Sequence, residues 1–79
     1  MVTVLFLGPL ADIAGTAELE LPAPLDWDAL LAAVNPETAD QLRDERVKVA
    51  CAGQILANKH TLNAPDGDEV ALLPPVSGG

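Results

Sequence analysis

The sequence predicts an α+β fold in which one main helix packs across a mixed sheet of about five strands. Three observations predict it. Strand-like alternation occurs in the first and last stretches of the chain, one stretch between them has helical periodicity, and 79 residues are enough for a single domain. Because the helix supplies a long connection, the first and last strands can pair in parallel.

The first two strands are predicted from period-2 alternation. Residues 2–7 and 16–21 each place apolar side chains at every second position, and the alternation in the second run leaves threonine and glutamate facing water. The predicted inward positions of these two runs are Val2, Val4, Phe6, Ala17, Leu19 and Leu21. Gly8-Pro9 ends the first run, so the two strands are expected to pair antiparallel.

The main helix is predicted after the two strands. Asp26 suits the N-cap position, and Asn35-Pro36 ends the helix because proline disfavours helical backbone at the preceding residue. The apolar stripe at i, i+3, i+4 and i+7 consists of Trp27, Leu30, Leu31 and Val34. Shorter helical stretches are expected around 10–14 and 38–43.

The remaining strands are predicted at 47–51, 55–57 and 69–73. Cys51 shares the inward face of the first of these runs with two valines, so we expect it to pack in the core and not to act as a sulfur donor. Val70 and Leu72 point inward in the last run. The complete order of elements is typical of the β-grasp, or ubiquitin-like, fold.

Composition limits the classes of function. The net charge of −8 argues against nucleic-acid binding, because phosphates would repel the chain. No run approaches the roughly 20 apolar residues of a membrane helix, and one cysteine allows no internal disulfide. A cytoplasmic protein without a membrane segment is the simplest expectation. His60 has no cluster of ligand residues near it, so no metal site is predicted.

The last six residues form the most distinctive feature of the chain. Pro74-Pro75 ends the final strand and stiffens its exit, and Val76 and Ser77 lead to Gly78-Gly79. Six extended residues reach about 20 Å. Two glycines leave a terminal carboxylate with little bulk around it, which suits a narrow channel and close approach by a reagent. We therefore expect a β-grasp domain over 1–75 and a working tail over 76–79.

The stretch from Asp66 to Gly79 resembles the signature of the small, sulfur-carrying subunits of molybdopterin synthase, with support from 2–7 and 47–53. The resemblance implies that Gly79 is adenylated, converted to a thiocarboxylate, and donates its sulfur to a cyclic pyranopterin precursor. Gly78, Ser77, Val76, Pro75 and Pro74 would insert with it. The turn at Ala52-Gly53 departs from the Asn-Gly common in this family.

The resemblance also implies partners. They are a large catalytic subunit, in a heterotetramer of two small and two large subunits, and an adenylating enzyme that uses ATP and Mg²⁺. The chain itself would bind no cofactor and would not catalyse alone. We expect Leu5, Leu7 and Leu73 to form an apolar patch on the outward face of adjacent strands that docks both partners in turn.

Three alternatives remain open at this point. The chain could carry sulfur for thiamine thiazole or for tRNA thiolation. It could instead be a ubiquitin-like modifier joined to lysines through Gly79, or a plain interaction module for which Gly79 has no role.

Overall fold

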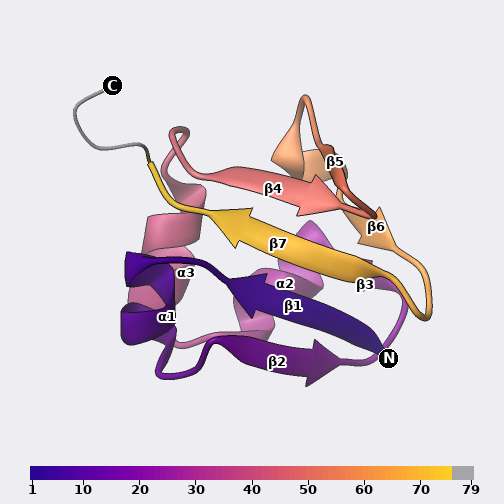
Figure 1. Cartoon of the computed structure of the whole chain (residues 1–79), viewed down its shortest axis with the longest axis horizontal. Helices are drawn as coiled ribbons and strands as arrows, with labels where there is room; N and C mark the ends of the chain where they lie inside the picture. The colour runs from indigo at the N-terminus through magenta and orange to yellow at the C-terminus, as the bar shows by residue number, and fades with distance from the viewer. Residues whose placement is uncertain (76–79) are drawn as a thin grey trace.

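A computed structural model describes residues 1–75 and confirms the predicted mixed sheet (Figure 1). Five strands lie in the order β2-β1-β7-β4-β5. Their bounds are Val2–Phe6 for β1, Glu18–Leu21 for β2, Lys48–Cys51 for β4, Gln54–Ile55 for β5 and Glu69–Leu73 for β7. As predicted, β1 pairs antiparallel with β2 and parallel with β7. The parallel pair in the centre makes both strands end on the same side of the molecule.

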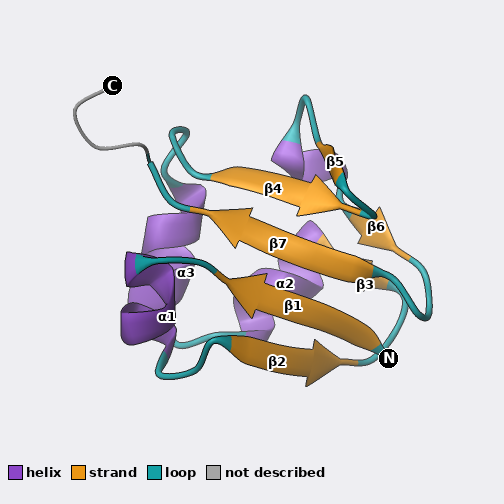
Figure 2. Cartoon of the chain, viewed as in Figure 1, coloured by secondary structure: helices purple, strands orange, loops and turns teal. Residues whose placement is uncertain are grey.

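Three short helices pack against the sheet, where the sequence predicted one main helix. They are α1 (Pro9–Ala14), α2 (Trp27–Ala33) and α3 (Pro36–Arg43), and all three lie on one face of the sheet (Figure 2). A 3₁₀ helix, η1 (Lys59–Thr61), follows β5. The helix predicted around 38–43 is longer than expected, because α3 begins at Pro36. It has 8 residues, and α2, the predicted main helix, has 7.

Side-chain caps explain where two of these helices begin. Asp26 Oδ1 accepts a hydrogen bond from the Ala29 amide at 2.8 Å, as the sequence predicted for the N-cap of α2. Asn35 Oδ1 accepts from the Thr38 amide at 2.7 Å and caps α3, with Pro36 at its first position. Asn35-Pro36 thus separates two helices in addition to ending the first.

The core lies between the helices and one face of the sheet. The strand residues that the alternation placed inward in β1, β4 and β7 are almost completely buried there, apart from Cys51. They pack with residues of all three helices and of the loop after η1. The fully or nearly fully buried apolar residues of this cluster are Val2, Val4, Phe6, Leu10, Leu25, Trp27, Leu30, Leu42, Val47, Val49, Leu62, Ala64, Val70 and Leu72.

The structure corrects three details of the sequence prediction. Ala17 is exposed and precedes β2, because the Thr16 hydroxyl bonds to the Glu18 carbonyl at 2.8 Å and holds this stretch in a local turn. Cys51 is only half-buried at the rim of the core. A second sheet, formed by β3 (Leu25–Asp26) and β6 (Asn63–Ala64), was not predicted, since two-residue strands carry no periodicity.

Within residues 1–75, no helix is long and apolar enough to cross a membrane.

Candidate functional site

The predicted tail begins where β7 ends. Pro74 and Pro75 follow Leu73 directly, and both are half-buried. The predicted tail residues Val76, Ser77, Gly78 and Gly79 lie outside the described residues. The structure therefore defines the exit of the tail and the surface around it.

The pairing of β1 with β7 stops at this exit for a chemical reason. Leu7 continues the ladder beyond β1, since its amide donates to the Leu72 carbonyl at 3.2 Å. In a parallel ladder, the next bond would run from the amide of residue 74 to the Leu7 carbonyl. Pro74 has no N–H, and the Leu7 carbonyl instead accepts from the Leu10 amide at 3.2 Å. The chain therefore leaves the sheet at Pro74.

The predicted docking residues lie on the face of the sheet that the helices leave open. Leu5 and Leu7 alternate with the buried Val4 and Phe6, so their side chains point away from the core. Leu7 is 39% exposed, and Leu5 and Leu73 are half-buried. Extending the register of β1 and β7 by one residue places Leu7 beside Leu73 at the tail exit. The patch predicted from the sequence is thus brought together.

The apolar surface extends farther across the sheet than the sequence indicated. Leu5 pairs with Ala71, Ala71 with Ala50, and Ala50 with Ile55. These four residues form a continuous row across four strands, which we call the open-face row. Ile55 is 63% exposed, the largest exposed fraction among the large hydrophobic residues of the described chain. The position of Ile55 on the open face was not predicted from the sequence, because β5 has only two residues and shows no alternation.

Charged residues border this surface. Glu18 pairs with Leu5 at one end of the open-face row, and Glu20 and Glu69 flank Thr3 on the two strands beside it. Lys48 pairs with Leu73 on the side of the tail exit. The open face therefore changes from acidic near the start of β1 to apolar near the exit, where its neighbouring charge is a cation.

Cys51 does not have the environment of a reactive thiol. Its Sγ lies 3.8 Å from Asp68 Oδ2. Burial, and then the negative charge and hydrogen bond of Asp68, raise the pKa of the Cys51 thiol. The thiolate, which is the nucleophilic form, is disfavoured at neutral pH.

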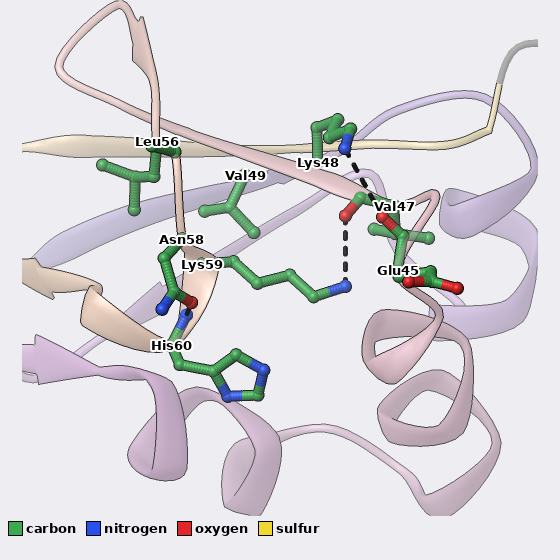
Figure 3. Close-up of a pocket in the computed structure, with 9 residues that line it drawn as sticks. Glu45, Val47, Lys48, Val49, Leu56, Asn58, Lys59 and His60 are labelled. Carbon is green, nitrogen blue, oxygen red and sulfur yellow. Dashed lines mark hydrogen bonds between the residues drawn. The ribbon is translucent and has the colours of Figure 1, made fainter.

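One cavity of about 180 Å³ lies on the other side of β4 from β7 (Figure 3). The Lys59 side chain crosses it, and its ammonium group donates to the main-chain carbonyls of Val47, at 3.1 Å, and Asp44. Burial lowers the pKa of Lys59. With two of its three protons held by carbonyls, the amine ties η1 to the loop before β4 and is a poor nucleophile.

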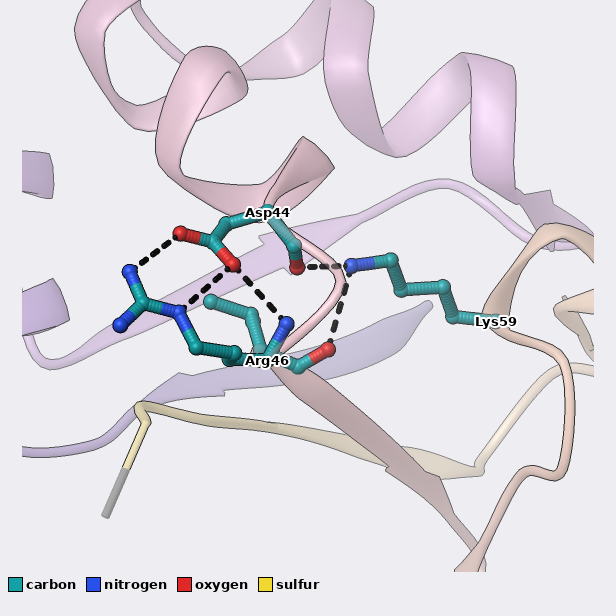
Figure 4. A network of polar contacts seen from close by, with 4 residues as sticks. Asp44, Arg46 and Lys59 are labelled. Carbon is teal, nitrogen blue, oxygen red and sulfur yellow. Dashed lines mark hydrogen bonds and ion pairs between the residues drawn. The ribbon is translucent and has the colours of Figure 1, made fainter.

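Asp44 lies at the centre of the polar network beside this cavity (Figure 4). Its Oδ1 accepts from the Arg46 amide at 2.9 Å and from Arg46 Nε at 3.1 Å, and its Oδ2 accepts from Arg46 Nη2 at 2.9 Å. The hydrogen bonds from Arg46 lower the pKa of Asp44 to about 2. The network fixes the loop between α3 and β4.

His60 is exposed in η1, and its ring and that of Trp27 make a T-shaped contact with the centroids 5.4 Å apart. Among residues 1–75, no three or more histidine, cysteine or carboxylate side chains gather in a way that could hold a metal ion.

The chain is similar along its whole length to known proteins. The model of the ThiS family matches residues 4–79. A curated relative, the molybdopterin synthase sulfur carrier subunit of Escherichia coli, is 35% identical over an alignment that covers 100% of both chains.

Two solved structures show the same β-grasp fold at full length. One is a chain in the complex of subunits 1 and 2 of molybdopterin-converting factor from Helicobacter pylori, with 28% identity, a TM-score of 0.65, and coverage of 99% of this chain and 97% of that one. The other is small archaeal modifier protein 1 from Methanosarcina acetivorans, with 26% identity, a TM-score of 0.69, and coverage of 99% and 95%.

Proposed function

The chain belongs to the ThiS family, and from that membership we propose that it is the sulfur carrier subunit of a molybdopterin synthase. The observation that carries the proposal is the full-length alignment with the E. coli sulfur carrier subunit. The family match extends through Gly79, so it includes the Pro-Pro-Val-Ser-Gly-Gly stretch that follows β7.

The proposed chemistry takes place on the carboxylate of Gly79. A carboxylate is a poor acyl donor, since its pKa is about 3.5 and the anion repels nucleophiles. In the proposed sequence the carboxylate attacks the α-phosphate of ATP on a separate activating enzyme with Mg²⁺, and pyrophosphate leaves. A sulfide-level donor then displaces AMP and forms the C–S bond of a thiocarboxylate. This sulfur forms a C–S bond to a carbon of the pterin precursor as a C–O bond of that carbon breaks. Water then hydrolyses the acyl–sulfur bond, which leaves the sulfur on the pterin and restores the carboxylate of Gly79.

The open face is the proposed docking surface for a larger catalytic subunit. Its apolar residues Leu5, Leu7 and Leu73 adjoin the exit at Pro74, and the open-face row extends the surface to Ile55. The solved complex of two molybdopterin-converting factor subunits supports a two-component assembly. We propose a heterotetramer of two small and two large subunits in which the activating enzyme competes for the same face.

Intact-mass measurement tests the chemistry directly. The full chain is incubated with its activating enzyme, ATP, Mg²⁺ and a sulfide donor, and with the large subunit and precursor in a second step. A mass gain equal to replacement of one oxygen by sulfur is expected, followed by its loss when precursor is added. Deletion of Gly79 is the matched control and should abolish the gain. No gain in the intact chain would overturn the proposal.

A protein modifier is the second candidate function, because a small archaeal modifier protein has the same fold at 26% identity. The two functions differ in the fate of Gly79. A modifier forms isopeptide bonds to lysines of other proteins, whereas a carrier ends as a free thiocarboxylate. Tagged chain in cell extract should therefore appear as one low-mass species if it is a carrier, and as a ladder of conjugates if it is a modifier.

A further inference from the structure

We infer that Gly8 is a positioning residue for the tail, because the space that its missing side chain leaves is filled by Pro74. The inference rests on the proposed sulfur-carrier function and names a residue of the site that lies far from Gly79 in the sequence. It concerns the direction in which the chain leaves the sheet.

The first step is the turn that contains Gly8. The Leu10 amide donates to the Leu7 carbonyl at 3.2 Å and the Ala11 amide donates to the Gly8 carbonyl at 3.1 Å. Gly8 has φ 55° and ψ −133°, which fits the first central position of a type II′ turn, a position that favours glycine. Pro9 follows as the first residue of α1. The turn is therefore closed by hydrogen bonds on its α1 side.

The second step is the contact with the tail exit. A Cβ on residue 8 would lie 3.3 Å from Pro74 Cγ, which is tighter than nine in ten Cβ contacts in proteins. By contrast, a Cβ built on Gly15, which also has positive φ (78°), would meet nothing within 4 Å. The contact is thus specific to Gly8 and does not follow from positive φ alone.

The third step concerns which side of the contact would move, the turn at Gly8 or Pro74. Leu7 before Gly8 is bonded to Leu72, and Leu10 after it is 2% exposed in the core. Pro74 has no amide to bond to the sheet. An added methyl group at Gly8 would therefore displace Pro74 by a few tenths of an ångström and shift the point at which the chain leaves the sheet.

A change at Gly8 should therefore affect the rate of sulfur transfer and not the affinity for the large subunit. Docking depends on the open face, whereas transfer from the docked complex depends on where the tail points. A misplacement of 1 Å can cost 10²-fold in rate, so a few tenths of an ångström corresponds to a loss on the order of three- to five-fold.

A mutant cycle of Gly8→Ala, Pro74→Ala and the double variant tests the inference, because the backbone strain of alanine at position 8 is present with either residue at position 74. Gly15→Ala reports on alanine in the left-handed helical region alone. For each thiocarboxylated chain, single-turnover sulfur transfer to the precursor and the Kd for the large subunit are measured. We expect Gly8→Ala to slow transfer about three- to five-fold at an unchanged Kd when residue 74 is proline, and to slow it less when residue 74 is alanine. Gly15→Ala should transfer at the wild-type rate.

Equal rates for Gly8→Ala and wild type would overturn the inference while leaving the carrier function intact. The same Gly8→Ala effect in both residue-74 backgrounds would also overturn it. If Gly8→Ala does not fold, Pro74→Ala alone must slow docked transfer, and an unchanged rate contradicts the inference.

An NMR measurement separates this inference from the proposed function. The Cα–Hα residual dipolar couplings of Pro74 and Pro75 should change in Gly8→Ala and not in Gly15→Ala, whether or not the chain carries sulfur. Unchanged couplings refute the positioning role. Failure of the wild-type chain to gain sulfur, with changed couplings, refutes only the carrier function.

Discussion

Lys48 of β4 and Leu73 of β7 are register partners on adjacent antiparallel strands. A cation therefore lies directly beside the apolar residue closest to the tail exit. Opposite charges at such a cross-strand position stabilise a sheet, by roughly 0.2–1 kcal/mol. This pairing makes it possible to place a charge on the open face without losing the fold.

Leu73→Glu should weaken assembly with the large subunit and leave the domain folded. The new carboxylate would face Lys48, so the melting temperature should stay within a few degrees of wild type. Lost apolar burial and a desolvated charge should raise the Kd by at least about ten-fold, which corresponds to about 1.4 kcal/mol. Titration calorimetry measures the Kd. Ala29→Glu on the exposed side of α2 is the matched control, and wild-type affinity in Leu73→Glu would exclude this docking face.

Ile55→Ser should weaken the same complex through the far end of the open-face row. Because Ile55 is 63% exposed, its truncation should change the free energy of unfolding by less than about 0.5 kcal/mol. The Kd should rise about ten-fold if the side chain is buried on docking. Ala57→Ser, at an exposed position two residues away, should bind normally. An Ile55→Ser chain that binds as tightly as the control would confine the interface to the side of the tail exit.

Ala52→Asn should stabilise the domain. Ala52 and Gly53 both have positive φ, 52° and 82°, as a two-residue turn between β4 and β5 requires. Alanine in this left-handed region costs roughly 1–2 kcal/mol, and asparagine tolerates it better. We expect a gain of about 1 kcal/mol in the free energy of unfolding, measured by chemical denaturation. Ala57→Asn, outside the turn, should show no gain, and a destabilised Ala52→Asn would contradict the strain at this position.

Asp44→Asn should remove a contribution to stability that depends on pH. The pKa of Asp44 is about 2 in the folded protein, below its ordinary value of 3.8, because Arg46 donates hydrogen bonds to it. A lowered folded-state pKa stabilises the protein above the unfolded-state pKa and loses that effect as the pH falls. The difference in denaturation midpoint between wild type and Asp44→Asn should therefore be full at about pH 5–7 and disappear as the pH falls from about 4 to about 2.

An Arg46→Gln background provides the control for this titration. Without the guanidinium group, Asp44→Asn should change the denaturation midpoint less at neutral pH, because only the bond from the amide of residue 46 remains. An effect of Asp44→Asn that has the same size in both backgrounds would show that Arg46 is not the cause.

Local sequence signals predicted most of the fold. Alternation located β1 and β7, the Asp26 cap located α2, and Gly8-Pro9 marked the end of β1. What escaped prediction depends on tertiary contacts. The pairing of β3 with β6 joins residues far apart in the sequence, and Ala17 is held outside β2 by a hydroxyl contact. Ile55 joins the open-face row only through register across four strands, and the contact of Gly8 with Pro74 requires three-dimensional proximity.

Trp27 is a natural fluorescent probe of one contact in the domain. It is the only tryptophan, the chain has no tyrosine, and its ring carries Lys59 5.5 Å above the centroid and His60 at its edge. Intrinsic fluorescence therefore reports on one place, the contact of α2 with η1 on the helical side of the sheet. An unchanged emission spectrum during binding would indicate that a ligand engages the opposite side, without any label on the chain.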